Sequence, residues 1–259
     1  MEPIRSAANT QVKRVRAVRS GKLPGLLLLE GPRLVADALA SGLVLELLLV
    51  STDKPELAEA LAAAAGERLL RIDAELLGRI SDLKTSPGVL ALVEAPAPRR
   101  APDLAQVLAP FDAPLVLVVD GVADPANLGA LARSAEAAGA AALVVVAGGA
   151  TPFSPRALRG SMGSLLRLAV FVAADADEAA RAVAAAGLRV VRPDTRGGVD
   201  WRAVDWAPAT ALWIGGETRA AGAEGLAVSI PMAGEVESLN VSVAASLLLF
   251  AAGRGPAGA

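Results

Sequence analysis

Short apolar runs alternate with amphipathic segments over the first 94 residues. Each run is bounded by turn-forming residues, which predicts strands at Leu26–Glu30, Val44–Val50, Arg68–Ile72 and Val89–Glu94. Between and before them we predict helices over Asn9–Arg19, from Pro32 to just before Gly42, and over Pro55–Ala65 and Ala74–Ile80. Proline in the first helical turn and glycine after the last support two of these helices. This order predicts a compact α/β unit.

The second half of the chain repeats this alternation. Leu115–Val119 is a continuous apolar run, as expected for a strand of a parallel sheet that is covered on both faces. Further strands are predicted at Leu143–Val146, Ala169–Val172, Leu188–Val191, Leu212–Ile214 and Val228–Ile230. The helices predicted with them cover Asn127–Ala138, Pro155–Leu165 and Asp177–Ala186, and a last one begins at about Leu239.

Residues 95–114 are rich in proline and include the pair Arg99-Arg100. Such a composition is typical of a linker. We therefore predict two domains, 1–96 and 113–259, joined by a linker at 97–112.

Composition narrows the possible chemistry. The chain has no cysteine and no histidine, which excludes disulfides, thiolate catalysis, imidazole bases and metal sites built from these residues. Apolar stretches such as Leu26–Leu29 and Val243–Ala252, the latter broken by Ser246, are too short to span a bilayer. The first twenty residues lack the apolar core of a signal peptide. We therefore expect a cytoplasmic protein with no membrane association.

The net charge of −2 does not mark the whole chain as a nucleic-acid binder. Residues 1–33, however, carry a local net charge of +5 that suits contact with phosphate. The basic residues there are Arg5, Lys13, Arg14, Arg16, Arg19, Lys22 and Arg33, against Glu2 and Glu30. Charge alone equally allows a solvated basic helix.

Ligands of parallel α/β sheets bind beyond the carboxyl ends of strands, and polar residues follow the strand that ends at Asp120. Asn127 stands where a helix N-cap is expected, and Gly129 would let a ligand approach the first helical turn. Arg133 follows nearly two turns later, so Asn127 and Arg133 are expected near one face. A helix N-terminus beside an arginine favours an anion. A plain capping asparagine and a surface arginine remain an alternative.

Two further strand ends carry unusual residues. One predicted strand ends in two glycines and a carboxylate, in the segment Trp213-Ile214-Gly215-Gly216-Glu217. The glycines would let the backbone approach a ligand closely, and the carboxylate could bind ribose hydroxyls. A simple turn has the same pattern. The segment from Ile230 to Ser242 places Ser238 and Asn240 before a very apolar helix. Ser238 is predicted to cap that helix, and Asn240 and Ser242 need hydrogen-bond partners if they are buried. Hydrogen bonding of Ser242 to its own helix is an alternative.

Several common nucleotide and hydrolase motifs are missing. The chain has no G-x-x-x-x-G-K-[ST] loop, no G-x-G-x-x-G after a strand and no G-x-S-x-G elbow. A P-loop nucleotidase, a Rossmann dinucleotide enzyme and a serine hydrolase are therefore not supported.

Three motifs in this order resemble the SpoU (TrmH) family of RNA ribose 2'-O-methyltransferases, in the SPOUT superfamily. They are Asn127-x-Gly129-x-x-x-Arg133, Gly215-Gly216-Glu217 and Ile230-Pro-Met-Ala-Gly234-x-x-x-Ser238-Leu-Asn240-Val-Ser242. Thr151–Gly163 resembles a segment on the RNA-facing side of the family. Leu29-Glu30-Gly31-Pro32-Arg33 and Ser81-Asp82-x-Lys84 resemble its substrate-binding domain. Nearly the whole chain is therefore covered.

The resemblance implies an α/β fold with a C-terminal SPOUT domain, which has a parallel sheet and a deep trefoil knot. It implies a small α/β N-terminal domain similar to ribosomal protein L30e, and a homodimer with the site near the interface. The implied cofactor is S-adenosylmethionine, with no metal, and the implied substrate is structured RNA. A separate N-terminal domain favours 23S ribosomal RNA by analogy, with tRNA as the alternative. A noncatalytic RNA-binding relative is a further alternative, which the intact motifs argue against.

The resemblance also assigns roles to residues. The implied catalytic residues are Arg133, Asn127, Glu217, Ser238 and Asn240; the implied cofactor-binding residues are Gly215, Gly216, Ile230, Met232, Leu239 and Thr195; and the implied RNA-binding residues are Lys13, Arg14, Arg16, Arg33, Arg156 and Arg159. A guanidinium is a poor base, so we expect Arg133 to clamp an RNA phosphate beside the attacking hydroxyl. Asn127 is expected to orient Arg133 and the ribose.

Overall fold

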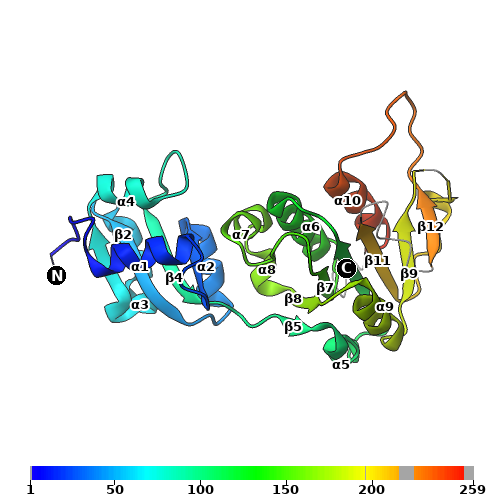
Figure 1. Ribbon diagram of the computed structural model, residues 1–259, viewed down its shortest axis with the longest axis horizontal. Helices are drawn as coiled ribbons and strands as arrows, with labels where there is room; N and C mark the ends of the chain where they lie inside the picture. The colour runs from blue at the N-terminus through cyan, green and yellow to red at the C-terminus, as the bar shows by residue number, and fades with distance from the viewer. Residues whose placement is uncertain (1, 196, 216–224, 254–259) are drawn as a thin grey trace. The chain divides into compact units, whose positions relative to one another are not determined.

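The computed structural model describes residues 2–195, 197–215 and 225–253. The chain forms two compact units, Met1–Ala97 and Pro98–Ala259, and both are α/β structures (Figure 1). No helix in the described ranges is both long enough and apolar enough to cross a membrane.

The first unit is a mixed four-stranded sheet in the order β1-β4-β2-β3, antiparallel except between β2 and β3. Its elements are α1 (Thr10–Arg19), β1 (Leu26–Glu30), α2 (Pro32–Ala40), β2 (Leu45–Ser51), α3 (Pro55–Ala65), η1 (Gly66–Arg68), β3 (Leu69–Ile72), α4 (Ala74–Ile80) and β4 (Val89–Glu94). The predicted bounds of β1, α3, α4 and β4 agree with those observed. Val12 and Val15 bury the apolar side of α1 in the core of this unit, which leaves its basic side chains at the surface.

In its described residues, the second unit is built on eight strands, all parallel, in the order β10-β12-β9-β11-β6-β7-β8-β5. The strands are β5 (Arg99–Arg100), β6 (Leu115–Asp120), β7 (Ala142–Val146), β8 (Ala169–Ala173), β9 (Arg189–Pro193), β10 (Val199–Asp200), β11 (Thr210–Gly215) and β12 (Leu226–Ser229). β6 and β7 are buried along their whole length, as the continuous apolar runs predict. The prediction of a parallel sheet is confirmed.

Helices and short 3-10 turns connect these strands. They are η2 (Ala101–Asp103), α5 (Leu104–Leu108), α6 (Pro125–Ala137), α7 (Pro155–Ser161), α8 (Ser164–Arg167), α9 (Ala176–Ala185), η3 (Trp201–Ala203) and α10 (Val241–Ala251). The helix predicted over Pro155–Leu165 is divided into α7 and α8, because Met162 and Gly163 both adopt left-handed backbone conformations that no continuing helix allows. α6 packs against α7, α8 and α10, so it lies at the centre of the helical layer.

The prediction of a linker at 97–112 is wrong over most of this segment, which belongs to the second unit. β5 pairs with β8, and Ala101, Leu104 and Leu108 are buried in the core of the second unit beside Phe171. Pro102 lies in the 3-10 turn η2, while Pro98 precedes β5 and Pro110 follows α5, and proline is tolerated at all three positions. The observed boundary between the units therefore falls between residues 97 and 98. The trefoil knot and the similarity to L30e remain predictions.

Candidate active site at the carboxyl edge of the sheet

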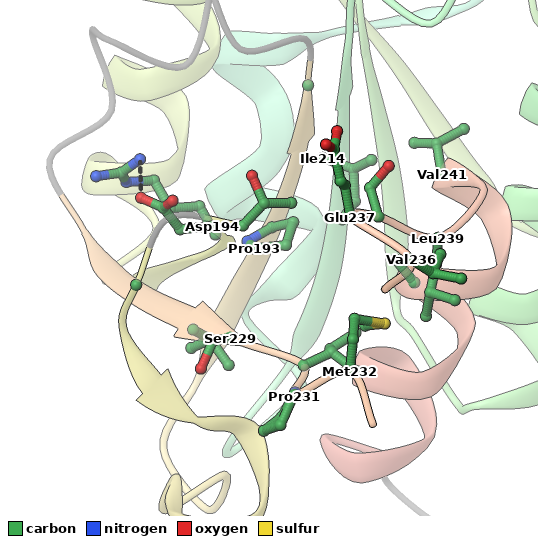
Figure 2. A pocket seen from close by; sticks show the side chains of 18 residues that line it. Pro193, Asp194, Ile214, Ser229, Pro231, Met232, Val236, Glu237, Leu239 and Val241 are labelled. Carbon is green, nitrogen blue, oxygen red and sulfur yellow. Dashed lines mark ion pairs between the residues drawn. The ribbon is translucent and has the colours of Figure 1, made fainter. Parts of the chain in front are cut away.

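A cavity of about 670 Å³ opens where three neighbouring strands end, as the strand-end argument predicts (Figure 2). Its walls come from the ends of β9, β11 and β12, from the segment between β12 and α10, and from the first turn of α10. The lining residues are Arg192, Pro193, Asp194, Thr195, Gly197, Ile214, Gly215, Val228, Ser229, Ile230, Pro231, Met232, Val236, Glu237, Ser238, Leu239, Val241 and Ala244.

The cavity brings together five of the six residues that the sequence assigns to cofactor binding: Thr195, Gly215, Ile230, Met232 and Leu239. Ser238, assigned to catalysis, lines the same space. The remaining cofactor residue, Gly216, and the carboxylate of Glu217 lie outside the described residues. Asn127, Asn240 and Arg133 do not line the cavity.

The composition of the walls suits an adenosyl group. Ile214, Val228 and Leu239 present apolar surface, while Ser229 and Asp194 add polar groups that can bind hydroxyls. The volume falls in the range of about 300–1,000 Å³ that is usual for small-molecule sites. The described residues contain no cluster of carboxylates that could hold a metal ion.

Apart from Thr195, the residues assigned from the sequence do not include the wall formed at the end of β9. Arg192 and Asp194 form an ion pair across 3.8 Å there (dashed in Figure 2), and Asp194 N donates to Val228 O of β12 at 2.9 Å. The available signal was the strand itself: a polar residue that directly follows a predicted parallel strand lies at the ligand-binding edge.

The first turn of α10 closes one side of the cavity. Asn240 caps this helix, because its Oδ1 accepts a hydrogen bond from Ser242 N at 2.9 Å. The prediction that Ser238 caps the helix and that the helix begins at about Leu239 is therefore wrong. Ser238 and Leu239 precede the cap and contribute to the cavity instead.

α6 also begins earlier than predicted. Asp124 is its N-cap and accepts from Ala126 N at 2.9 Å, and Pro125 occupies the first helical position. Asn127 is thus inside the first turn, and its backbone O and side-chain Oδ1 each lie 3.3 Å from Ser242 Oγ of α10. The predicted N-cap role of Asn127 is wrong, but the structure places it beside the helix that borders the cavity.

Gly129 has a different role from the predicted one. It is buried, and a Cβ at this position would lie 2.4 Å from Ala157 O and 2.8 Å from Ser161 N of α7. The glycine therefore permits the close packing of α6 on α7, rather than the approach of a ligand to the helix.

Arg133 is exposed on α6. Six residues separate it from Asn127, so the two side chains leave the helix about 120° apart, and the prediction that they share a face is wrong. The nearest carboxylate along the helix is that of Glu136, which accepts hydrogen bonds from Arg167 Nε at 2.6 Å and from Arg167 Nη2 at 2.8 Å. These hydrogen bonds hold the pKa of Glu136 below its usual range. Within the described part of the chain, no carboxylate is bonded to Arg133.

The basic residues assigned to RNA binding differ in their surroundings. Lys13 and Arg16 on α1 and Arg33 on α2 are exposed. Arg14 Nη2 forms an ion pair with Glu46 Oε2 at 2.6 Å. On α7, Arg156 forms an exposed ion pair with Asp124 at 3.4 Å, and Arg159 is half-buried.

Two family models match the chain. The model of the SpoU rRNA Methylase family matches residues 114–250, and that of the MRM3-like substrate binding domain matches residues 9–91. Together they cover both compact units.

Individual relatives agree with these models. The chain is 38% identical over 205 residues to the 23S rRNA (guanosine-2'-O-)-methyltransferase RlmB of Burkholderia sp, covering 75% of this chain and 80% of the relative. It is 29% identical to the 23S rRNA (guanosine(2553)-2'-O)-methyltransferase RlmP of Bacillus subtilis strain 168, covering 96% of this chain and 98% of the relative. The crystal structure of an AdoMet-bound rRNA methyltransferase from Sinorhizobium meliloti superposes with a TM-score of 0.82 at 28% identity, covering 97% of each chain.

Motifs, fold and relatives therefore agree along nearly the full length of the sequence. The chain belongs to the SpoU rRNA methylase family.

Proposed function

We propose that this protein transfers a methyl group from S-adenosylmethionine to a ribose 2'-hydroxyl of structured RNA, with 23S ribosomal RNA as the substrate. The observation that carries the proposal is the cavity, in which residues of two distant motifs, Gly215 and the segment from Ile230 to Leu239, form one site. The relatives named as 23S rRNA methyltransferases and the AdoMet-bound structure support the choice of substrate and cofactor. We also propose that the protein acts in the cytoplasm.

The cavity residues hold the cofactor in this proposal. Leu239 and Ile214 would pack against the adenine, backbone groups around Gly215 and Ile230 would bind its polar edge, and Ser229 or Asp194 would bind the ribose hydroxyls. When bound, S-adenosylmethionine supplies an electrophilic methyl group on a sulfonium. We propose that the protein needs no metal ion for this chemistry.

The remaining motif residues act on the RNA. Arg133 holds a phosphate beside the attacking 2'-hydroxyl, so that the phosphate or a water molecule removes the proton. Its exposure and its lack of a carboxylate partner among the described residues suit this role. Asn127 and Ser238 orient the ribose, and Glu217 completes the site. Holding the oxygen and the methyl group about 3 Å apart and in line lowers the barrier by several kcal/mol.

We assign RNA capture to the first unit, which matches a substrate-binding domain model. The exposed cations Lys13, Arg16 and Arg33 provide sequence-independent attraction to phosphate. Arg14 contributes less in this proposal, because Glu46 already neutralises it. Arg156 and Arg159 extend the contact on the second unit.

Calorimetry tests the cofactor assignment. We expect the purified protein to bind S-adenosylmethionine equally well with and without a chelator. Leu239→Asp should weaken binding at least tenfold, about 1.4 kcal/mol, because it places a carboxylate against the apolar wall. Val199→Asp introduces the same charge at an exposed position that does not line the cavity, and it should bind as the wild type does. Equal affinity of the Leu239 variant and the wild type would place the cofactor elsewhere.

We also propose a homodimer through α10. Val243, Leu247 and Phe250 of this helix are 49%, 38% and 61% exposed, whereas its other residues are buried or half-buried. With Trp201 they line an apolar hollow of about 590 Å³. An apolar patch of this kind on a helix face is characteristic of a protein interface.

Sedimentation equilibrium tests the dimer. The double variant Leu247→Asp, Phe250→Asp should sediment as a monomer at concentrations where the wild type is dimeric, because two carboxylates would be desolvated in each half of the interface. The control Val44→Asp changes an exposed valine in the first unit and should remain dimeric. A dimeric double variant would show that α10 is not the interface.

A further inference from the structure

Ser242 joins two parts of the proposed active site. It lies in the first turn of α10, where neighbouring residues Leu239 and Val241 line the cavity. Its hydroxyl contacts α6, 3.3 Å from both Asn127 O and Asn127 Oδ1. The Ser242 side chain therefore connects α10, which borders the cavity, with the Asn127 amide, to which we assign a contact with the RNA.

The hydrogen bond gives the Asn127 amide a direction. Asn127 O lies in a continuing helix and is available to a backbone donor, whereas Oδ1 has Ser242 as its one bonded donor among the described residues. A hydroxyl that donates to Oδ1 turns the amide nitrogen, Nδ2, away from α10. No acceptor within the described ranges is bonded to Nδ2, so its two protons remain available to a ligand.

A second contact holds Ser242 in place. Ser246 Oγ lies 2.6 Å from Ser242 O and 2.7 Å from Ser134 Oγ of α6. The pair Ser134–Ser246 fixes the register of α10 on α6, and Ser242–Asn127 orients the amide. The two contacts can be tested separately because Ser134 does not touch Asn127.

We propose that Ser242 is a positioning residue that fixes the Asn127 amide with Nδ2 toward the substrate, so that Asn127 acts as a hydrogen-bond donor to a phosphate or ribose oxygen. This inference rests on the proposed function. It assigns Asn127 a donor role and excludes it as the acceptor of the hydroxyl proton.

Steady-state methyl transfer to 23S rRNA tests the inference. Ser242→Ala should lower kcat about tenfold, the scale of one neutral hydrogen bond, and leave cofactor affinity within about twofold. Ser242→Thr retains the hydroxyl and should restore most of kcat. Asn127→Asp still accepts from Ser242 but replaces the donor with a charged acceptor, so kcat should fall at least about a hundredfold, as for loss of one well-placed electrostatic group.

Ser134→Ala is the matched control, because it breaks the Ser134–Ser246 hydrogen bond between α6 and α10 and should lower the melting temperature without changing kcat. Wild-type kcat in Ser242→Ala, or an equal loss of kcat in Ser134→Ala, would overturn the inference.

A second measurement separates this inference from the proposed function. If the wild type methylates no RNA, the proposed function has failed, and ¹⁵N relaxation of Asn127 Nδ2 still tests the orientation. The amide should be ordered in the wild type and in Ser242→Thr, and disordered in Ser242→Ala. An equally ordered amide in Ser242→Ala would overturn the role of Ser242, whatever the RNA result.

Discussion

Arg133→Ala should lower the turnover number at least about a hundredfold while the melting temperature and cofactor affinity stay close to wild type. The loss is the scale expected when one well-placed charge no longer stabilises a developing negative charge. Stability should change little because Arg133 is exposed and forms no ion pair with a carboxylate among the described residues. Single-turnover methyl transfer, differential scanning calorimetry and cofactor titration on one preparation measure the three quantities.

Arg133→Lys is the informative companion variant. An ammonium keeps the charge but cannot make the two parallel hydrogen bonds of a guanidinium to phosphate, so we expect little rescue. A purely structural arginine would give the opposite pattern, in which the melting temperature and cofactor affinity fall together with activity. Near-normal single-turnover transfer by Arg133→Ala would remove Arg133 from the mechanism.

Gly129→Ala should lower the free energy of unfolding of the second unit by about 2 kcal/mol and reduce activity with it. The new Cβ would lie 2.4 Å from Ala157 O, and because the obstructing atoms are backbone, α6 and α7 must separate. Overpacking of this kind costs about 1–3 kcal/mol or more, which exceeds the gain in helix propensity. Urea unfolding followed by tryptophan fluorescence measures the effect, since Trp201, Trp206 and Trp213 all lie in the second unit.

Gly78→Ala provides the control for this prediction. Gly78 lies in α4 of the first unit, and a Cβ there would meet nothing within 4 Å. The change should raise the stability of the first unit by about 0.5–1 kcal/mol through helix propensity. Circular dichroism should detect this gain, whereas the tryptophan transition should not move. If Gly129→Ala proved as harmless as Gly78→Ala, the close packing of α6 on α7 would not be what requires the glycine.

The sequence predicts the α/β alternation well because local signals define its elements. Apolar runs such as Leu115–Val119 are long enough for a strand and are bounded by turn residues, and Pro55 and Gly66 delimit a helix on their own. The segment 97–112 shows where local signals mislead. Its prolines indicate a linker, but Leu104 and Leu108 are buried by tertiary contacts with α9 and the sheet, which composition does not reveal.

The candidate site was predictable where it depends on strand ends and on the family motifs. Gly215, Ile230 and Leu239 line the cavity as expected. The helix starts were predicted wrongly because adjacent polar residues compete for the cap: Asp124 caps α6 in place of Asn127, and Asn240 caps α10 in place of Ser238. The contacts of Gly129 with α7 and of Ser242 with Asn127 join residues from different helices, so no local pattern specifies them.

The most direct test of the central claim is the position of the transferred methyl group. The wild-type protein is incubated with methyl-labelled S-adenosylmethionine and an unmodified 23S rRNA transcript, and the labelled nucleoside is identified by nuclease digestion and mass spectrometry. We predict label on the ribose 2'-oxygen of one nucleotide, and a strongly reduced signal with Arg133→Ala. Label on a nucleobase, or no transfer by a protein that binds the cofactor and the RNA, would contradict the assignment of this chain as a ribose 2'-O-methyltransferase.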